Sequence, residues 1–102
     1  MKIIKAPTVK CKRCQTINTT AIDDFQEPNT ESNERNMGYE TGYSWTLEIT
    51  CTKCENELEI IVEAWEYPIG ILNYTEFETV GCSFVEEPVV EVEFDNEQYD
   101  LE

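Results

Sequence analysis

The chain has 102 residues, enough for one hydrophobic core and too few for two independent ones. Its 22 acidic and 7 basic residues give a formal net charge of −15, which repels nucleic-acid backbones and attracts basic surfaces. It has no histidine for general base catalysis, no apolar run near the roughly 20 residues of a membrane helix, and no signal-peptide pattern. We therefore expect one cytoplasmic domain that is not an enzyme.

Residues 1–22 contain the first of two C-x-x-C motifs, at positions 11–14. The β-branched pairs Thr8-Val9 and Thr16-Ile17 flank this motif, a pattern typical of a small hairpin with the motif at its turn. Residues 23–42 follow, with one proline, two glycines, many acidic residues and few apolar ones. This composition predicts a long acidic loop.

Residues 43–68 alternate between apolar and polar side chains, and this period of two indicates β-strands. One strand leads into the second C-x-x-C motif, at positions 51–54, and a longer strand leaves it. We therefore expect a hairpin whose turn carries the second pair of cysteines. The apolar positions of its two strands are Trp45, Leu47, Ile49, Leu58, Ile60, Val62 and Ala64.

Residues 69–95 contain two further strand candidates, at 73–80 and 89–94, and residues 96–102 are interpreted as an acidic tail. No segment has a sustained helical period. The sequence therefore predicts a single, mostly β domain built from small antiparallel sheets.

The cysteines of the two motifs, Cys11, Cys14, Cys51 and Cys54, are the predicted ligands of one structural Zn²⁺. Each C-x2-C turn directs two thiolates at one ion, and two turns complete a tetrahedral shell. Iron in a rubredoxin-like site would use the same ligands, and a redox dithiol would need only one pair. In a reducing cytosol paired motifs are more often metal ligands than disulfides, and an odd total of five cysteines also fits disulfides poorly. The fifth, Cys82, is expected to be a small buried residue.

Through Cys11-Lys12-Arg13-Cys14 and Cys51-Thr52-Lys53-Cys54 the chain resembles the zinc-ribbon group of folds. The resemblance covers about the first two thirds of the chain. Zinc ribbons often have glycine directly after each second cysteine, where this chain has Gln15 and Glu55. The resemblance implies an architecture with a zinc-ribbon-like four-cysteine site, and it implies no activity.

Acidic residues dominate the chain after the second motif, since no lysine or arginine follows Lys53. This asymmetry favours a non-catalytic acidic binding protein that occludes a basic partner, such as a nuclease or another nucleic-acid-binding protein. Inhibitors, immunity proteins and nucleic-acid mimics act in this way, whereas solubility alone is the simpler explanation of the acids. The candidate contact residues are Glu57, Glu59, Glu63, Glu66, Glu91, Glu93 and Asp95.

The alternative is a nucleic-acid- or transcription-associated zinc ribbon that uses basic residues near the motifs. Four thiolates with Zn²⁺ carry a charge near −2, so these cations are more simply explained as neutralising the site. Direct binding of nucleic acid is therefore the weaker hypothesis. The basic residues are Lys10, Lys12, Arg13 and Lys53.

The large aromatic residues are expected mostly in the core, with one or two at the surface as anchors among the acids. Their alternation along the strands does not identify which ones are exposed. They are Trp45, Trp65, Tyr67, Tyr74 and Phe77.

Overall fold

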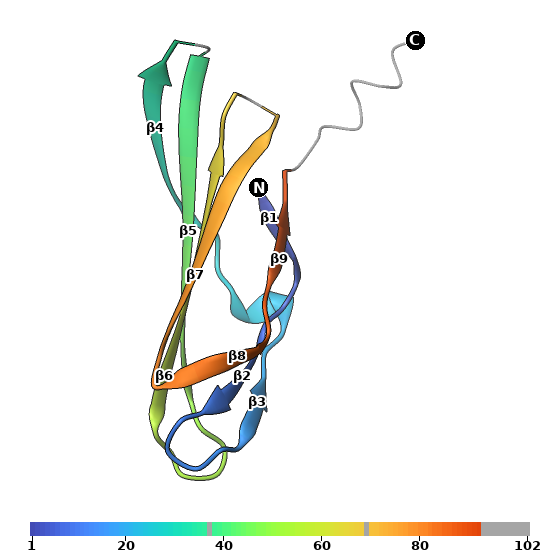
Figure 1. Cartoon of the computed structure of the whole chain (residues 1–102), viewed down its shortest axis with the longest axis vertical. Coiled ribbons are helices and arrows are strands. Elements are labelled where there is room, and N and C mark those ends of the chain that lie inside the picture. The colour runs from blue at the N-terminus through green and yellow to red at the C-terminus, as the bar shows by residue number, and fades with distance from the viewer. Residues whose placement is uncertain (37, 69, 93–102) are drawn as a thin grey trace.

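A computed structural model describes residues 1–36, 38–68 and 70–92, and these are mostly β-structure (Figure 1). The prediction of a mostly β fold with small antiparallel sheets is confirmed. The proposed tail at 96–102 lies outside the described residues. The elements are β1 (Lys2–Lys5), β2 (Thr8–Cys11), β3 (Ile17–Thr19), the 3-10 turn η1 (Ile22–Asp24), β4 (Asn29–Arg35), β5 (Gly38–Thr50), β6 (Glu57–Glu66), β7 (Leu72–Val80), β8 (Cys82–Glu86) and β9 (Val89–Glu91).

The largest sheet has the strand order β4-β5-β6-β7. Its centre is the predicted hairpin of β5 and β6, in which Thr50 lies opposite Glu57 and the connection, residues 51–56, contains the second C-x-x-C motif. The strand expected at 73–80 is β7, which lies antiparallel to β6. Alternation along β6 sends Ile60 and Val62 into the core, where neither is exposed.

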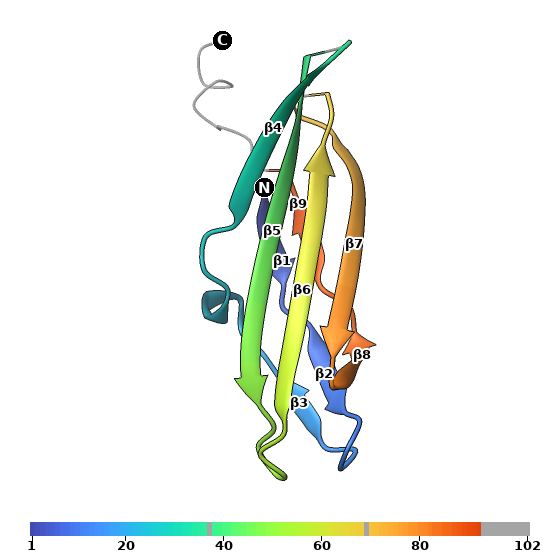
Figure 2. The same ribbon diagram turned by 90° about the vertical axis from the view of Figure 1, so that its left-hand side faces the viewer.

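Two smaller sheets, β1-β9 and β3-β2-β8, lie against one face of the large sheet (Figures 1 and 2). The core fills the space between these two layers. No described element covers the opposite face of the large sheet, which we call the outer face (Figure 2). The buried apolar residues are Ile3, Val9, Cys11, Trp45, Cys51, Leu58, Ile60, Val62, Ala64, Cys82 and Val90.

The prediction of a long loop over residues 23–42 is wrong, because η1, β4 and the start of β5 occupy most of it. Strand β4 is an edge strand and all seven of its residues are exposed. A strand with no buried face has no apolar alternation, so the sequence carries no signal for it. Its pairing with β5 is nevertheless regular, from Asn29 opposite Ser44 to Arg35 opposite Gly38.

The predicted first hairpin is formed by β2 and β3. Strand β8, which pairs with the other edge of β2, was not predicted from the sequence. Strand β1 had no signal either, because it is short and buries only Ile3. The last strand candidate, 89–94, is represented by β9, and Phe94 lies outside the described residues.

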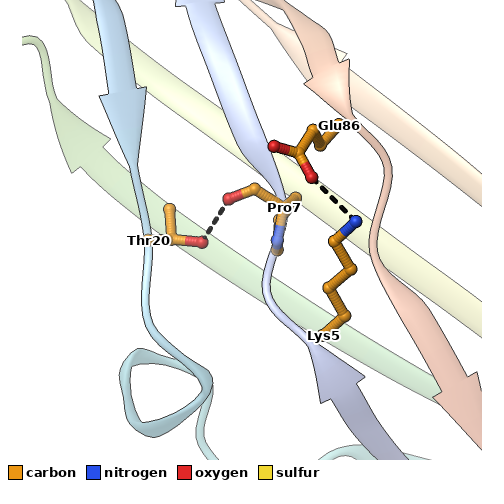
Figure 3. Close-up of polar contacts among 4 residues, drawn as sticks. All are labelled: Lys5, Pro7, Thr20 and Glu86. Atoms are coloured by element: carbon orange, nitrogen blue, oxygen red, sulfur yellow. Dashed lines mark hydrogen bonds and ion pairs between the residues drawn. The ribbon is translucent and has the colours of Figure 1, made fainter.

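Two polar contacts fix the connections of the smaller sheets (Figure 3). The hydroxyl of Thr20 donates to the carbonyl oxygen of Pro7 at 2.7 Å, which closes the base of the β2–β3 hairpin. The ammonium of Lys5 lies 2.7 Å from a carboxylate oxygen of Glu86. This hydrogen bond, and then the charge of Lys5, lowers the pKa of Glu86 below its ordinary value. Both side chains are half exposed, so the ion pair stabilises the fold only slightly.

Candidate metal centre and acidic sheet face

The two C-x-x-C turns, which we call the first knuckle (11–14) and the second knuckle (51–54), lie side by side at one end of the molecule (Figure 1). Their four Sγ atoms all lie within 4.8 Å of one another. Two of these distances join the knuckles: Cys11 to Cys54 at 3.6 Å, and Cys14 to Cys51 at 3.5 Å. A tetrahedral zinc–thiolate site with bonds near 2.3 Å has sulfur–sulfur edges of about 3.8 Å. The four predicted cysteines are therefore positioned to bind one metal ion, in a zinc-ribbon-like arrangement.

The two knuckles share one backbone conformation. In each, the first cysteine donates its N–H to the carbonyl five residues later, and its own carbonyl accepts the N–H four residues later. The residue after each second cysteine is left-handed, with φ of 68° at Gln15 and 63° at Glu55. These are the positions where zinc ribbons often have glycine, the residue that adopts this conformation most easily. The chain therefore keeps the left-handed turn with larger side chains.

Asn18 of β3, which no sequence motif identifies, connects the β2–β3 hairpin to the second knuckle. Its side chain is only 4% exposed. Its Nδ2 donates to Sγ of Cys51 at 3.6 Å and to the carbonyl of Thr16 at 3.1 Å. Its Oδ1 accepts the N–H of Thr52 at 3.1 Å. An amide that bonds a ligand sulfur and the adjoining backbone orients that ligand for the metal.

Hydrogen bonds lower the pKa of two of the four thiols. The backbone N–H groups of Cys54 and Lys53 are the main cause of the lowered pKa of Cys51, which is about 6. The side chain and then the backbone of Thr16 lower the pKa of Cys14. Both thiols therefore ionise more readily than an ordinary cysteine, and thiolate is the form that binds metal.

Cys54 shows the opposing effect. The backbone N–H of Asn56 is the largest single influence and lowers its pKa, but burial and the three neighbouring thiols together raise it to about 12. Four thiolates this close repel one another unless a cation lies between them. Metal binding at this cluster therefore releases protons.

The fifth cysteine, Cys82 of β8, is separate from the cluster and fully buried, as predicted. It lies opposite Cys11 in the β2–β8 pair, and its Sγ is 3.7 Å from the carbonyl oxygen of Val80. Burial raises its pKa. Cys82 is thus a neutral core residue beside the candidate metal centre.

Basic residues lie at the tips of both knuckles. Lys12 and Arg13 of the first knuckle and Lys53 of the second are exposed, and Lys10 is half buried in β2. Three of these cations belong to the two knuckles, which lie at one end of the molecule (Figure 1). They can offset the negative charge of a metal–thiolate centre.

The outer face of β4–β7 places like charges directly opposite one another. Glu48 of β5 lies opposite Glu59 of β6, and Glu63 of β6 lies opposite Glu76 of β7. Like charges in such cross-strand pairs destabilise a sheet. Arg35 is the sole cation in these four strands as described, and its Nη2 is 3.1 Å from a carboxylate oxygen of Glu40. The acidic outer face is therefore not neutralised from within the described sheet.

Three of the predicted contact residues lie on the outer face: Glu57, Glu59 and Glu63. They occupy odd-numbered positions of β6, whereas the even-numbered positions are buried. Glu91 does not lie on this face: it is exposed on β9 of a smaller sheet, where it lies opposite Lys2 of β1. The remaining two predictions, Glu93 and Asp95, lie outside the described residues.

Glu66 is not available for contact, contrary to the prediction. It lies on the inner side of β6 with Ala64 and is 9% exposed. One carboxylate oxygen accepts the hydroxyl of Tyr43 at 2.9 Å, and the other accepts the N–H of Gly70 at 2.6 Å. Glu66 therefore supports the turn after β6.

The aromatic residues divide between the two faces. Trp45 is buried, and Phe77 packs against the core. On the outer face the rings of Trp65 and Tyr74 stack, with centroids 4.3 Å apart and planes 10° apart, and Tyr74 is 46% exposed. Tyr74 is therefore a surface aromatic among the acids, as expected, whereas Trp65 is half buried, and an anchoring role for either stays a prediction.

Comparison with known proteins assigns no family: no family model, no curated protein and no solved structure matches the chain. Within residues 1–36, 38–68 and 70–92, no helix has the length and apolar character needed to cross a membrane. The fold and the cysteine geometry define a small antiparallel β protein with a four-cysteine metal-binding cluster.

Proposed function

We propose that this protein is a zinc-stabilised, non-catalytic binding protein whose acidic outer face occludes a basic partner protein. The observation that carries the proposal is that two pairs of glutamates, Glu48 with Glu59 and Glu63 with Glu76, lie directly opposite each other on neighbouring strands. Both destabilise the sheet, and a stable surface normally mixes charges of both signs. Features that lower stability are typical of surfaces that serve binding.

Zinc is the metal that the cluster supports best. Four thiolates in a closed tetrahedron suit Zn²⁺ and leave no open position for a substrate, so the ion's role is structural. When bound, it joins the β2–β3 hairpin to the β5–β6 hairpin, and therefore one layer of the fold to the other. Iron fits the same ligands, and the metal content of the purified protein distinguishes the two. A reducing compartment such as the cytoplasm keeps the thiols free to bind it.

Binding would rest on charge complementarity. The carboxylates of the outer face pair with the lysines and arginines that a nuclease or similar protein uses for phosphates, and so block that surface. Long-range attraction makes such association fast and sensitive to salt. This mode of action places the protein with inhibitors, immunity proteins and nucleic-acid mimics.

The test uses the full metal-loaded chain and two variants as baits in an extract of the native host. One variant removes four charges from the outer face. The matched control removes four exposed charges outside β4–β7. The substitutions are Glu48→Gln, Glu59→Gln, Glu63→Gln and Glu76→Gln in the first, and Asp23→Asn, Glu27→Gln, Glu87→Gln and Glu91→Gln in the control.

We expect a basic protein to be retained by the wild type and the control and lost by the outer-face variant. For the purified pair, raising the salt concentration from about 0.05 M to about 0.3 M should weaken Kd by about tenfold or more. Identical capture by both variants, or a Kd that does not respond to salt, would overturn the proposal.

A second candidate, direct binding of nucleic acid, is favoured by one observation: Lys12, Arg13 and Lys53 are exposed on adjacent turns. Basic knuckles of this kind can contact phosphates. A gel shift with DNA and RNA at low salt tests it, with the three cations replaced by glutamine as the matched variant. A shift lost in that variant supports this candidate, and the lack of any shift rejects it.

A further inference from the structure

The outer face contains a hollow of about 300 Å³ between β4, β5 and β6. Glu31 of β4 and Glu63 of β6 line it, together with Gly42 and Trp65. Glu31 lies opposite Gly42, and Glu63 lies opposite Ser44, so the two carboxylates come from strands on either side of β5. The hollow thus has an aromatic side chain and two acidic groups at its border.

The position of Trp65 is set by its neighbours in one row of the sheet. Gly42, Trp65 and Tyr74 lie opposite one another across β5, β6 and β7. Tyr74 stacks on the β7 side of the indole, so the hollow lies on its β5 side. A Cβ at residue 42 would be 3.1 Å from Nε1 of Trp65, so glycine there gives the indole room above β5. The ring is held in place and forms one wall of the hollow.

An indole wall flanked by two carboxylates is complementary to a guanidinium group. A planar guanidinium stacks on an indole and also donates several hydrogen bonds to carboxylates. A lysine ammonium is a compact, strongly hydrated charge that gains less from the ring. The described cation closest in the sheet, Arg35, pairs with Glu40 and lies beyond the border of the hollow.

We infer that this hollow receives an arginine side chain from an exposed segment of the basic partner, an inference that rests on the proposed function. The guanidinium stacks on Trp65 and bonds Glu31 and Glu63. The carboxylates that continue along the same face, Glu59 and Glu76 among them, meet the neighbouring basic residues of that partner. The outer face therefore selects arginine-rich over lysine-rich protein surfaces.

The experiment measures binding of two peptides of equal charge, nine arginines and nine lysines, to the metal-loaded full chain by calorimetry at about 0.15 M salt. We expect the arginine peptide to bind about fivefold more tightly. The variant Trp65→Val, which keeps a strand-forming residue, should abolish this preference. The pair Glu31→Gln and Glu63→Gln should weaken the arginine peptide about tenfold.

The matched control is the pair Glu57→Gln and Glu78→Gln, which removes the same charge from the outer face away from the hollow. It should weaken the arginine peptide by no more than about twofold. Glutamine has nearly the size and shape of glutamate, so the two glutamine pairs test the arginine site even if Trp65→Val does not fold. Equal binding of the two peptides, with both glutamine pairs equally affected, would overturn the arginine site and leave the proposed function standing. No binding of either peptide would overturn the proposed function itself.

Discussion

Asn18 hydrogen-bonds the sulfur of a candidate metal ligand on the other layer of the fold: its Nδ2 donates to Sγ of Cys51 at 3.6 Å. Asn18 belongs to β3 of the small sheet, whereas Cys51 follows β5 of the large sheet. The same side chain accepts the N–H of Thr52, so it holds both the sulfur and the backbone of the second knuckle. The candidate metal centre therefore depends on more than its four cysteines.

The first prediction concerns this amide. Asn18→Ala removes the donor to Cys51, and it should lower metal affinity by about 10- to 100-fold, the usual effect of losing a group that orients a ligand. Competition with a chromophoric chelator measures it. Asn33→Ala, in the exposed strand β4, is the control and should leave the affinity unchanged. Equal affinities for the two variants would show that Asn18 does not orient the sulfur.

The second prediction compares two buried cysteines. Cys51→Ser should release the metal and unfold the domain, because the binding energy of a structural metal is folding energy. Cys82→Ala should keep one metal per chain and lose only about 1–2 kcal/mol of stability, through lost packing. Metal content and thermal unfolding of both variants check this. A Cys51→Ser protein that retains its metal and its Tm would refute the ligand assignment.

The features that the sequence predicted are those with a local signal. The spacing of each C-x-x-C pair and the period of two in β5 and β6 are visible within a few residues. The features that it missed depend on contacts between distant strands. Strand β4 buries no face, so it has no alternation. Asn18 and Gly42 matter only because of what folding places beside them, a ligand sulfur and an indole.

Glu66 shows a different limit of sequence reasoning. The even-numbered residues of β6 face the inner side, so alternation predicts that Glu66 is buried. Its charge instead predicts that it is exposed to solvent. The groups that make its burial tolerable, the hydroxyl of Tyr43 and the N–H of Gly70, come from other parts of the sheet and its turn. Alternation was the better guide here than residue type.

The third prediction concerns the left-handed residues after each knuckle. Gln15→Gly and Glu55→Gly remove the steric penalty of a side chain at φ near 65°, and each should stabilise the metal-loaded protein by up to about 1 kcal/mol. Chemical denaturation measures the change. Gln15→Ala retains a Cβ and should give no such gain. If alanine stabilises as much as glycine, backbone strain is not the cause.

The fourth prediction concerns pH. Lys5 lowers the pKa of Glu86, so Lys5→Met should return that pKa toward its ordinary value. Because the folded-state pKa is the depressed one, the ion pair stabilises the protein above the ordinary pKa of glutamate. That contribution is lost as pH falls through the folded-state value. The titration of Glu86 followed by NMR measures the shift, and an unchanged pKa in Lys5→Met would contradict the prediction.

The fifth prediction separates stability from binding on the outer face. Glu63→Gln removes the repulsion with Glu76 directly opposite, so it should stabilise the protein by about 0.5 kcal/mol. The gain should shrink as salt screens the charges. Glu57→Gln is the control, since Glu57 lies opposite the uncharged Thr50 and should gain less. Denaturation at low and high salt measures both.

The same Glu63→Gln substitution should weaken binding of an arginine-rich partner, because Glu63 borders the hollow beside Trp65. A variant that folds more stably and binds less well would identify the carboxylate as a residue that serves recognition at the expense of the sheet. A loss of stability in Glu63→Gln would instead mean that Glu63 makes favourable contacts within the fold. The like-charge pairs would then no longer argue for a binding surface.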